Sequence, residues 1–191
     1  MVAEGVAFPL QSYSTIKEAR LDQYGKTVYA YIYDSTDNQK TDYDRVAFSF
    51  GPGSMIADLN EGQWSDWIPV ILTWQELPIQ TFFKIKVIKL KEDGFFRFRF
   101  FYNNLNKYVT KPTHVADEIT EGVGPMVDFV DNFPPQLIFY DEDKQCFLEE
   151  ANMSLEWHKK AADFILDKYH PDIFINDTYT PNQMLTSRWW M

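Results

Sequence analysis

The side chains with the clearest chemical potential are two lysines and two arginines on a predicted β-hairpin: Lys84, Lys86, Arg97 and Arg99. They alternate with apolar and aromatic residues, and alternate residues of a strand point to the same face of a sheet. On a chain with a net charge of −10, such a basic stripe could bind a phosphorylated substrate or dock against an acidic protein surface. A solvated hairpin face would also carry these residues, so all three interpretations stay open.

A second candidate is Asp177, which follows a short apolar segment at residues 173–175. Its carboxylate could bind a metal ion, although a solvated or capping loop residue would look the same. The three histidines, at positions 114, 158 and 170, lie far apart and form no short Asp/His ligand motif. No threonine near a predicted loop has an adjacent histidine that could serve as its base. We therefore predict no catalytic residue in this chain.

The hairpin that carries the basic stripe is predicted at residues 81–102. Asp93-Gly94 indicates its turn, because a type I′ turn needs positive φ at both central residues. The face opposite the basic stripe is then apolar and belongs to a core. Its members are Ile85, Val87, Phe96, Phe98, Phe100 and Tyr102.

Further strands precede the hairpin. Alternation predicts strands at residues 28–34, 46–50 and 54–59, and Pro69 favours an edge strand at 64–73. Residues 15–24 are expected to form a polar connector or a helical turn. Aromatic residues favour strands, and they make up 17% of the chain. We therefore predict a β-rich domain at residues 1–132, mainly antiparallel and arranged as a sandwich or a barrel.

The pattern changes after residue 132. An unbroken apolar run at 136–140 is typical of a buried parallel strand. Two helices are predicted next, at 142–150 and from Ser154, where Ser154 would be the N-cap. Pro171 ends the second helix, and residues 173–175 form another apolar strand. The fold class is thus α+β, with a short βαβ segment at residues 133–191.

Composition excludes several classes of function. A net charge of −10 and a pI near 4.7 argue against non-specific binding to nucleic acid or to an anionic membrane. One cysteine permits neither an intramolecular disulfide nor a thiolate-rich metal site. No apolar run approaches the roughly 20 residues of a membrane helix. These features do not determine the cellular compartment, and among the compartments they favour the cytoplasm.

The segment PDIFINDTYTPNQ, residues 171–183, together with SLEWH at 154–158, resembles a type I phosphodiesterase/nucleotide pyrophosphatase-like protein of the alkaline phosphatase superfamily. The resemblance implies an α/β hydrolase core interrupted by a long insertion. Residues 1–132 would be that insertion domain, and the chain would return to the core from residue 136. The chain ends on Arg-Trp-Trp-Met, and termini are usually polar, so we expect it to be a fragment.

The resemblance also implies chemistry. Family members use two divalent metals, usually zinc, and a Thr or Ser nucleophile that forms a phospho-enzyme intermediate. Asp177 would be a metal ligand in the parent protein, and the nucleophile would lie upstream of Met1. The fragment alone is expected to be inactive and to hold no metal. Its partners would be the remainder of the parent hydrolase and a phosphate ester or nucleotide substrate, with self-association through the C-terminal strand as a further expectation.

An alternative is a stand-alone β-rich binding module, with carbohydrate as its ligand. Trp64, Trp67 and Trp74 would then be stacking platforms. Exposed tryptophans aligned on one flat face would favour this alternative.

Overall fold

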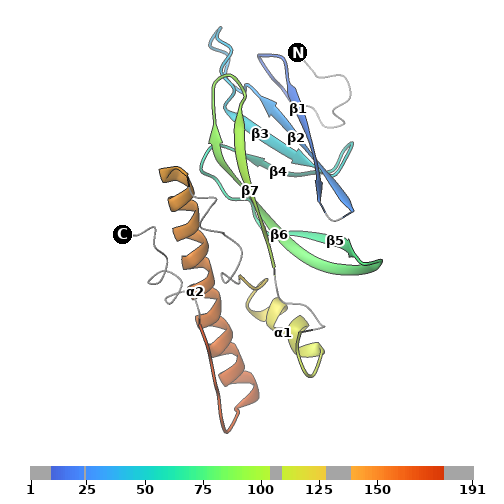
Figure 1. Cartoon of the computed structure of the whole chain (residues 1–191), viewed down its shortest axis with the longest axis vertical. Coiled ribbons are helices and arrows are strands. Elements are labelled where there is room, and N and C mark those ends of the chain that lie inside the picture. Colours follow the sequence, from blue (N-terminus) through green and yellow to red (C-terminus); the bar gives the residue numbers. More distant parts are fainter. Residues whose placement is uncertain (1–9, 24, 104–108, 128–138, 179–191) are drawn as a thin grey trace. The chain divides into compact units, whose positions relative to one another are not determined.

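The protein consists of two compact units, residues 1–101 and 102–191. The computed structural model describes residues 10–23, 25–103, 109–127 and 139–178, and these form seven strands and two helices (Figure 1). The predicted α+β class is confirmed. The predicted domain boundary at residue 132 lies outside the described residues.

The first unit contains a four-stranded antiparallel sheet with the order β1-β2-β3-β4 (Figure 1). Each strand pairs with the next one along the chain, so the sheet is a meander. Its strands are β1 (Lys17–Gln23), β2 (Lys26–Tyr33), β3 (Arg45–Ser49) and β4 (Met55–Leu59). The three strands that alternation predicted here are confirmed as β2, β3 and β4.

Strand β2 is one of the two inner strands of this sheet, and both of its faces are buried. Val28, Ala30 and Ile32 point to one face and are nearly inaccessible to water. Tyr31 and Tyr33 point to the other face, where they form a cluster with Leu10 and Ala47. A strand with two apolar faces needs cover on both sides, and the segment at residues 10–16 provides part of that cover.

The expectation of a polar connector or helical turn at residues 15–24 is wrong, because residues 17–23 form strand β1. Its residues pair with β2 from Lys17↔Ile32 to Gln23↔Lys26. Only Ala19 and Leu21 are apolar in this strand, so its own sequence gives a weak period-two signal. The ladder offered by β2 decides the conformation, which is a case of tertiary context overriding local pattern.

A three-stranded antiparallel sheet follows, with the order β5-β6-β7. Its strands are β5 (Ile68–Trp74), β6 (Leu77–Leu90) and β7 (Phe96–Tyr102). Pro69 lies in β5, which is an edge strand of this sheet as predicted. In the described part of the chain the two sheets do not close, so the expectation of a barrel is wrong.

The two hairpin turns of this sheet differ from the prediction, because the type I′ geometry occurs between β5 and β6 and not at Asp93-Gly94. Gln75 and Glu76 have φ of 47° and 66° between the paired residues Trp74 and Leu77, as a two-residue type I′ turn requires. Neither residue type favours positive φ. Asp93-Gly94 does not form such a turn, because only Gly94 has positive φ.

The turn between β6 and β7 spans Lys91 to Gly94 instead. The Gly94 N–H donates to the Lys91 carbonyl at 2.8 Å, and the Lys91 N–H donates to the Phe95 carbonyl at 2.8 Å. A Cβ on Gly94 would lie 3.0 Å from Lys17 and 3.1 Å from Tyr43, so glycine is needed for close approach as well as for its φ of 82°. The tip of this hairpin therefore packs against the first sheet.

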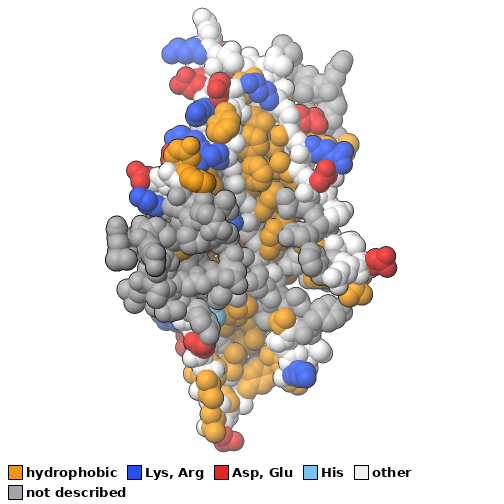
Figure 2. Space-filling view, in the orientation of Figure 1, with side chains coloured by type: hydrophobic (Ala, Val, Ile, Leu, Met, Phe, Trp, Pro, Cys, Tyr) orange, Lys and Arg blue, Asp and Glu red, His pale blue; other side chains and the backbone are white. Residues whose placement is uncertain are grey.

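The surface of the strand-bearing unit is mixed. Hydrophobic side chains gather in the upper part of the space-filling view, with charged side chains around them (Figure 2). Large hydrophobic side chains exposed in this unit include Tyr13, Met55, Ile71, Leu77 and Phe95.

The second unit contains helices α1 (His114–Gly122) and α2 (Asp141–Tyr169). The prediction of two separate helices in the latter region is wrong, because α2 is one helix of 29 residues. No Gly or Pro lies between residues 141 and 169 to interrupt it, and Ser154 is a fully enclosed helix residue, not an N-cap. Its end before Pro171 is confirmed, with His170 at φ 44°.

The two helices share a small apolar core. Ala116 and Ile119 of α1 pack with Ala161 of α2, and Trp157 and Phe164 lie against them. The Trp157 indole N–H also donates to the Gly124 carbonyl at 2.9 Å. The chain's one cysteine, Cys146, is fully enclosed in the N-terminal half of α2.

Neither predicted apolar strand of this unit forms among the described residues. At 136–140, residues 136–138 lie outside the description, while Phe139 is exposed and Tyr140 caps α2. Residues 173–175 have an irregular backbone, with Ile173 79% exposed and Ile175 87% exposed. The expectation of a strand is therefore wrong for the described part of both segments.

Candidate functional site

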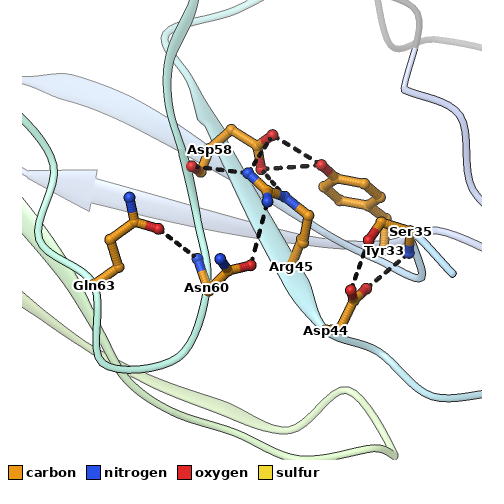
Figure 3. Close-up of polar contacts among 7 residues, drawn as sticks. All are labelled: Tyr33, Ser35, Asp44, Arg45, Asp58, Asn60 and Gln63. Carbon is orange, nitrogen blue, oxygen red and sulfur yellow. Dashed lines mark hydrogen bonds and ion pairs between the residues drawn. The ribbon is translucent and has the colours of Figure 1, made fainter.

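The candidate site with the best-defined geometry lies on the first sheet, where three strands bring Tyr33, Arg45 and Asp58 together (Figure 3). Tyr33 is the register partner of Arg45, and Asp58 is the partner of Ala47 two residues further along β3. Residues two apart on a strand share a face, so these side chains converge on one side of the sheet. We call them the Tyr33–Arg45–Asp58 network.

Asp58 is the acceptor at the centre of this network. Arg45 Nη2 lies 2.9 Å from Asp58 Oδ2, and Arg45 Nε donates to Oδ1 at 3.1 Å. The Tyr33 hydroxyl lies 2.9 Å and 3.0 Å from the two carboxylate oxygens. Burial and the Asp58 carboxylate raise the pKa of Tyr33 to about 12, and the hydrogen bond to Asp58 raises the pKa of Arg45. Tyr33 thus remains a hydrogen-bond donor at neutral pH.

Neighbouring polar groups hold this network in place. Asn60 Oδ1 accepts from Arg45 Nη1 at 3.3 Å, and Gln63 Oε1 accepts from the Asn60 N–H at 3.1 Å (Figure 3). Ser35 donates through its N–H and its hydroxyl to the Asp44 carboxylate, at 2.7 Å and 2.6 Å. Asp58 and Asn60 thus both hold the guanidinium of Arg45, while the Ser35–Asp44 contact fixes the chain next to Tyr33 and Arg45.

A second polar centre is Asp34, which is 0% exposed and fixes the segment at residues 12–14. Its carboxylate accepts from the Ser14 hydroxyl at 2.5 Å and from the Thr36 N–H at 3.1 Å. Its own N–H donates to the Ser12 hydroxyl at 3.2 Å, and its carbonyl accepts from the Tyr13 N–H at 2.9 Å. Burial alone would raise the pKa of Asp34, but hydrogen bonds, that of Ser14 foremost, outweigh it and the pKa is lowered.

Tyr33 and Asp58 of the network line a pocket of about 540 Å³. Its apolar and aromatic lining comes from Leu10, Tyr13, Tyr33 and Met55. Its polar lining comes from Gln11, Ser35 and Asp58. The volume lies within the range of roughly 300–1,000 Å³ that is usual for ligand pockets. Hydroxyl, amide and carboxylate groups in such a pocket can bind and orient a ligand.

The predicted basic stripe has a different environment from the one expected. Lys86 is 3% exposed, with its Nζ 5.7 Å from the centre of the Trp64 ring, so a solvated face is wrong for this residue. Lys84 Nζ lies 5.4 Å from the centre of the Trp67 ring and donates to the Ser65 carbonyl at 3.1 Å. Burial lowers the pKa of Lys84. Both ammonium groups lie against tryptophan rings in cation–π geometry.

Arg97 and Arg99 lie on β7 and are partly exposed. The ring contacts Phe96–Phe98 and Phe98–Phe100, at 5.5 Å and 5.2 Å between centroids, show that the alternate residues of β7 share the opposite face. The structure therefore places the two arginines on one face of β7, as the alternation predicted.

The tryptophans do not form the flat platform that would favour the binding-module alternative in its predicted form. Trp64 and Trp67 both contact the buried Phe101, at 6.3 Å and 6.4 Å between ring centroids. They are partly buried in an aromatic cluster with the two lysines. The side chain of Trp74 lies outside the description.

Asp177 is exposed and follows the exposed run at 173–175. Among the residues that the structure describes, no three His, Cys, Asp or Glu side chains gather closely enough to hold a metal ion. The predicted basic residues thus lie on the neighbouring strands β6 and β7, with the two lysines against tryptophan rings, and Asp177 belongs to the second unit.

Sequence reasoning missed Asp34 and the Tyr33–Arg45–Asp58 network. Asp34 could have been suspected from its position at the end of a strongly alternating strand, before a polar loop. Tyr33, Arg45 and Asp58 are spaced 12 and 13 residues apart, and only the strand register brings them together.

No protein-family model, curated protein or solved structure matches this chain. Neither α1 nor α2 is both long and apolar enough to span a membrane.

Proposed function

We propose that this chain is part of a metal-dependent phosphodiesterase or nucleotide pyrophosphatase-like hydrolase of the alkaline phosphatase superfamily. In this proposal the first unit belongs to an insertion domain, and the end of the second unit contributes to an α/β hydrolase core. The family resemblance of residues 154–158 and 171–183 supports it.

The structural observation that carries the proposal is the exposed run at residues 173–175, which ends next to a carboxylate. Ile173 and Ile175 are 79% and 87% exposed, although burial of such a side chain contributes about 1.5–3 kcal/mol. Uninterrupted apolar segments of this kind suit the buried strands of a parallel sheet. The proposed occupant of this surface is the core sheet of the parent hydrolase, which would pair with the run and bury it.

The position of Asp177 fits such a core. In open α/β sheets, ligands bind beyond the carboxyl ends of the strands. Asp177 follows the run by two residues, so a strand at 173–175 would carry it to that edge of the sheet. There it would supply one carboxylate ligand to a divalent metal, with zinc expected, and the remaining ligands and the nucleophile would come from the rest of the parent. A bound metal would stabilise charge on the phosphoryl oxygens.

Substrate binding by the basic residues is a further part of the proposal. Arg97 and Arg99 are partly exposed and could meet a phosphate group, whereas Lys84 and Lys86 would first have to leave the tryptophan cluster. Arginine also suits this role because its guanidinium binds phosphate oxygens in a bidentate manner.

The test is a hydrolase assay of the product of the complete open reading frame on bis(p-nitrophenyl) phosphate. We expect turnover that a chelator abolishes and Zn²⁺ restores. Asp177→Asn should lower the activity by at least roughly 10- to 100-fold, which is the usual effect of removing a residue that supports a metal ligand. Asp172→Asn is the matched control, an exposed aspartate on the other side of the run, and it should retain activity. Absent or metal-independent turnover would overturn the proposal, and turnover by the 191-residue chain alone would show that the catalytic groups are misplaced.

A further inference from the structure

We propose that the pocket bordered by Tyr13 and Asp58 binds a neutral polyhydroxylated ligand of the sugar class. This site goes beyond the proposed hydrolase function, because it lies in the first unit and shares no residue with the predicted metal or phosphate site. Its chemistry follows from the charge, the hydrogen-bonding groups and the exposed ring that the pocket presents.

The charge of the pocket is balanced. Asp58 is its one carboxylate among the lining residues, and Arg45 neutralises it through an ion pair at 2.9 Å. An anionic ligand would meet the carboxylate, and a cationic ligand would meet the adjacent guanidinium. A neutral ligand avoids both like-charge contacts, and it needs no opposite charge in the pocket when it leaves water.

The carboxylate retains capacity for a ligand hydroxyl. An ionised carboxylate offers about four acceptor sites. Tyr33 supplies one hydrogen and Arg45 supplies two, from Nε and Nη2, so about one site is left. The Asp58 side chain is 26% exposed, which gives a ligand access to it. A hydrogen bond from a neutral hydroxyl to a carboxylate is charge-assisted and therefore strong.

An aromatic surface stands beside this acceptor. Tyr13 is 46% exposed, and its hydroxyl accepts a hydrogen bond from the Gln11 amide at 3.0 Å. Gln11 keeps a side-chain carbonyl, which can accept from a second ligand hydroxyl. An exposed ring flanked by acceptors suits a sugar, which has one apolar C–H face and a rim of hydroxyl groups.

The aromatic wall of the pocket is also held in position before any ligand arrives. Asp34 accepts from the Tyr13 N–H and from the Ser14 hydroxyl, so the backbone that carries the ring is tied to the end of β2. Binding then orders few new groups and loses little entropy. A quaternary ammonium ligand fits less well, since it is best held by several exposed rings and Tyr33 is buried.

The test uses the 191-residue chain and saturation-transfer NMR with glucose, galactose, mannose and their β-linked disaccharides as probes. We expect saturable binding of at least one saccharide. Tyr13→Ala should weaken it by about 5- to 10-fold, which corresponds to the energy of an aromatic contact. Phe95→Ala, which removes another exposed aromatic ring of the same unit, is the matched control and should bind as the wild type does.

Three outcomes would overturn this proposal. The first is the absence of saturable binding by any saccharide. The second is equal affinity of Tyr13→Ala and Phe95→Ala. The third is displacement of the saccharide by inorganic phosphate or tetramethylammonium at the same concentration, which would show a charged ligand class. A Gln11→Ala variant, altered at an exposed position, guards against misfolding and should also weaken binding. Asp177→Asn should leave binding unchanged, so the outcome is independent of the hydrolase assay.

Discussion

Replacement of Asp34 tests whether a buried carboxylate holds the N-terminal segment against the first sheet. Asp34 is fully enclosed and accepts from the Ser14 hydroxyl at 2.5 Å and from the Thr36 N–H at 3.1 Å. The Thr36 hydroxyl lies at 3.3 Å and adds little. A hydrogen bond to a charged group contributes about 1.5–3 kcal/mol to stability.

The two well-formed bonds set the expected magnitude. Asp34→Ala removes both and should lower the free energy of unfolding by about 3–5 kcal/mol. Asp34→Asn keeps an acceptor for Thr36 but loses the negative charge, and its amide group would face the Ser14 hydroxyl. We expect it to cost about 1.5–3 kcal/mol.

The pH dependence follows from the direction of the pKa shift. The folded protein lowers the pKa of Asp34, so its contribution to stability is present above the unfolded pKa of about 3.9. It is lost as the pH falls through the lower folded value. The difference between wild type and Asp34→Asn should therefore stay constant from pH 8 to about pH 5 and narrow below about pH 4.

Urea unfolding followed by circular dichroism between pH 3 and pH 8 measures both effects. Asp44→Asn is the matched control, because Asp44 also accepts two hydrogen bonds, from Ser35, but is partly exposed. It should cost less than about 1 kcal/mol. The reasoning fails if Asp34→Asn costs no more than the control, or if its cost is the same at pH 3 and pH 7.

Two further predictions concern Tyr33 and the contact between α1 and α2. Because the folded protein raises the pKa of Tyr33 to about 12, its contribution is complete below the unfolded value of about 10 and is lost toward pH 12. Tyr33→Phe should flatten the wild-type decline in unfolding free energy above pH 10, and an unchanged profile would contradict this. Gly122→Ala would place a Cβ 2.3 Å from the Phe164 ring, so thermal unfolding should show a loss of about 1–3 kcal/mol. That loss should shrink in a Phe164→Leu background, and an equal loss would argue against the clash.

The parts of the fold that could be predicted from sequence are those with a strong local signal. Strand β2 follows from its alternating residues, and the end of α2 follows from Pro171, which cannot continue a helix. Strand β1 has only two apolar residues, and its conformation depends on a neighbour. The type I′ turn at Gln75-Glu76 was equally hidden, because the two strands impose positive φ on residue types that do not favour it.

The candidate site was harder to predict than the fold. The alternation of β6 and β7 indicated the faces of Lys86 and Arg97, but not the tryptophan that lies against the lysine. That contact depends on the pairing of Trp64 with Lys86, which are 22 residues apart. Asp58 was not singled out at all, since its partners come from two other strands.

The enclosed Cys146 provides a natural reporter of motion in α2. A buried thiol does not react with an aqueous disulfide reagent until its surroundings open. Because the chain has one cysteine, no engineered probe is needed. The labelling rate under native conditions, divided by the rate in denaturant, gives the equilibrium constant of that opening and hence its free energy. Slower labelling in the presence of a saccharide, a metal ion or a larger parent protein would then show which of them stabilises the second unit.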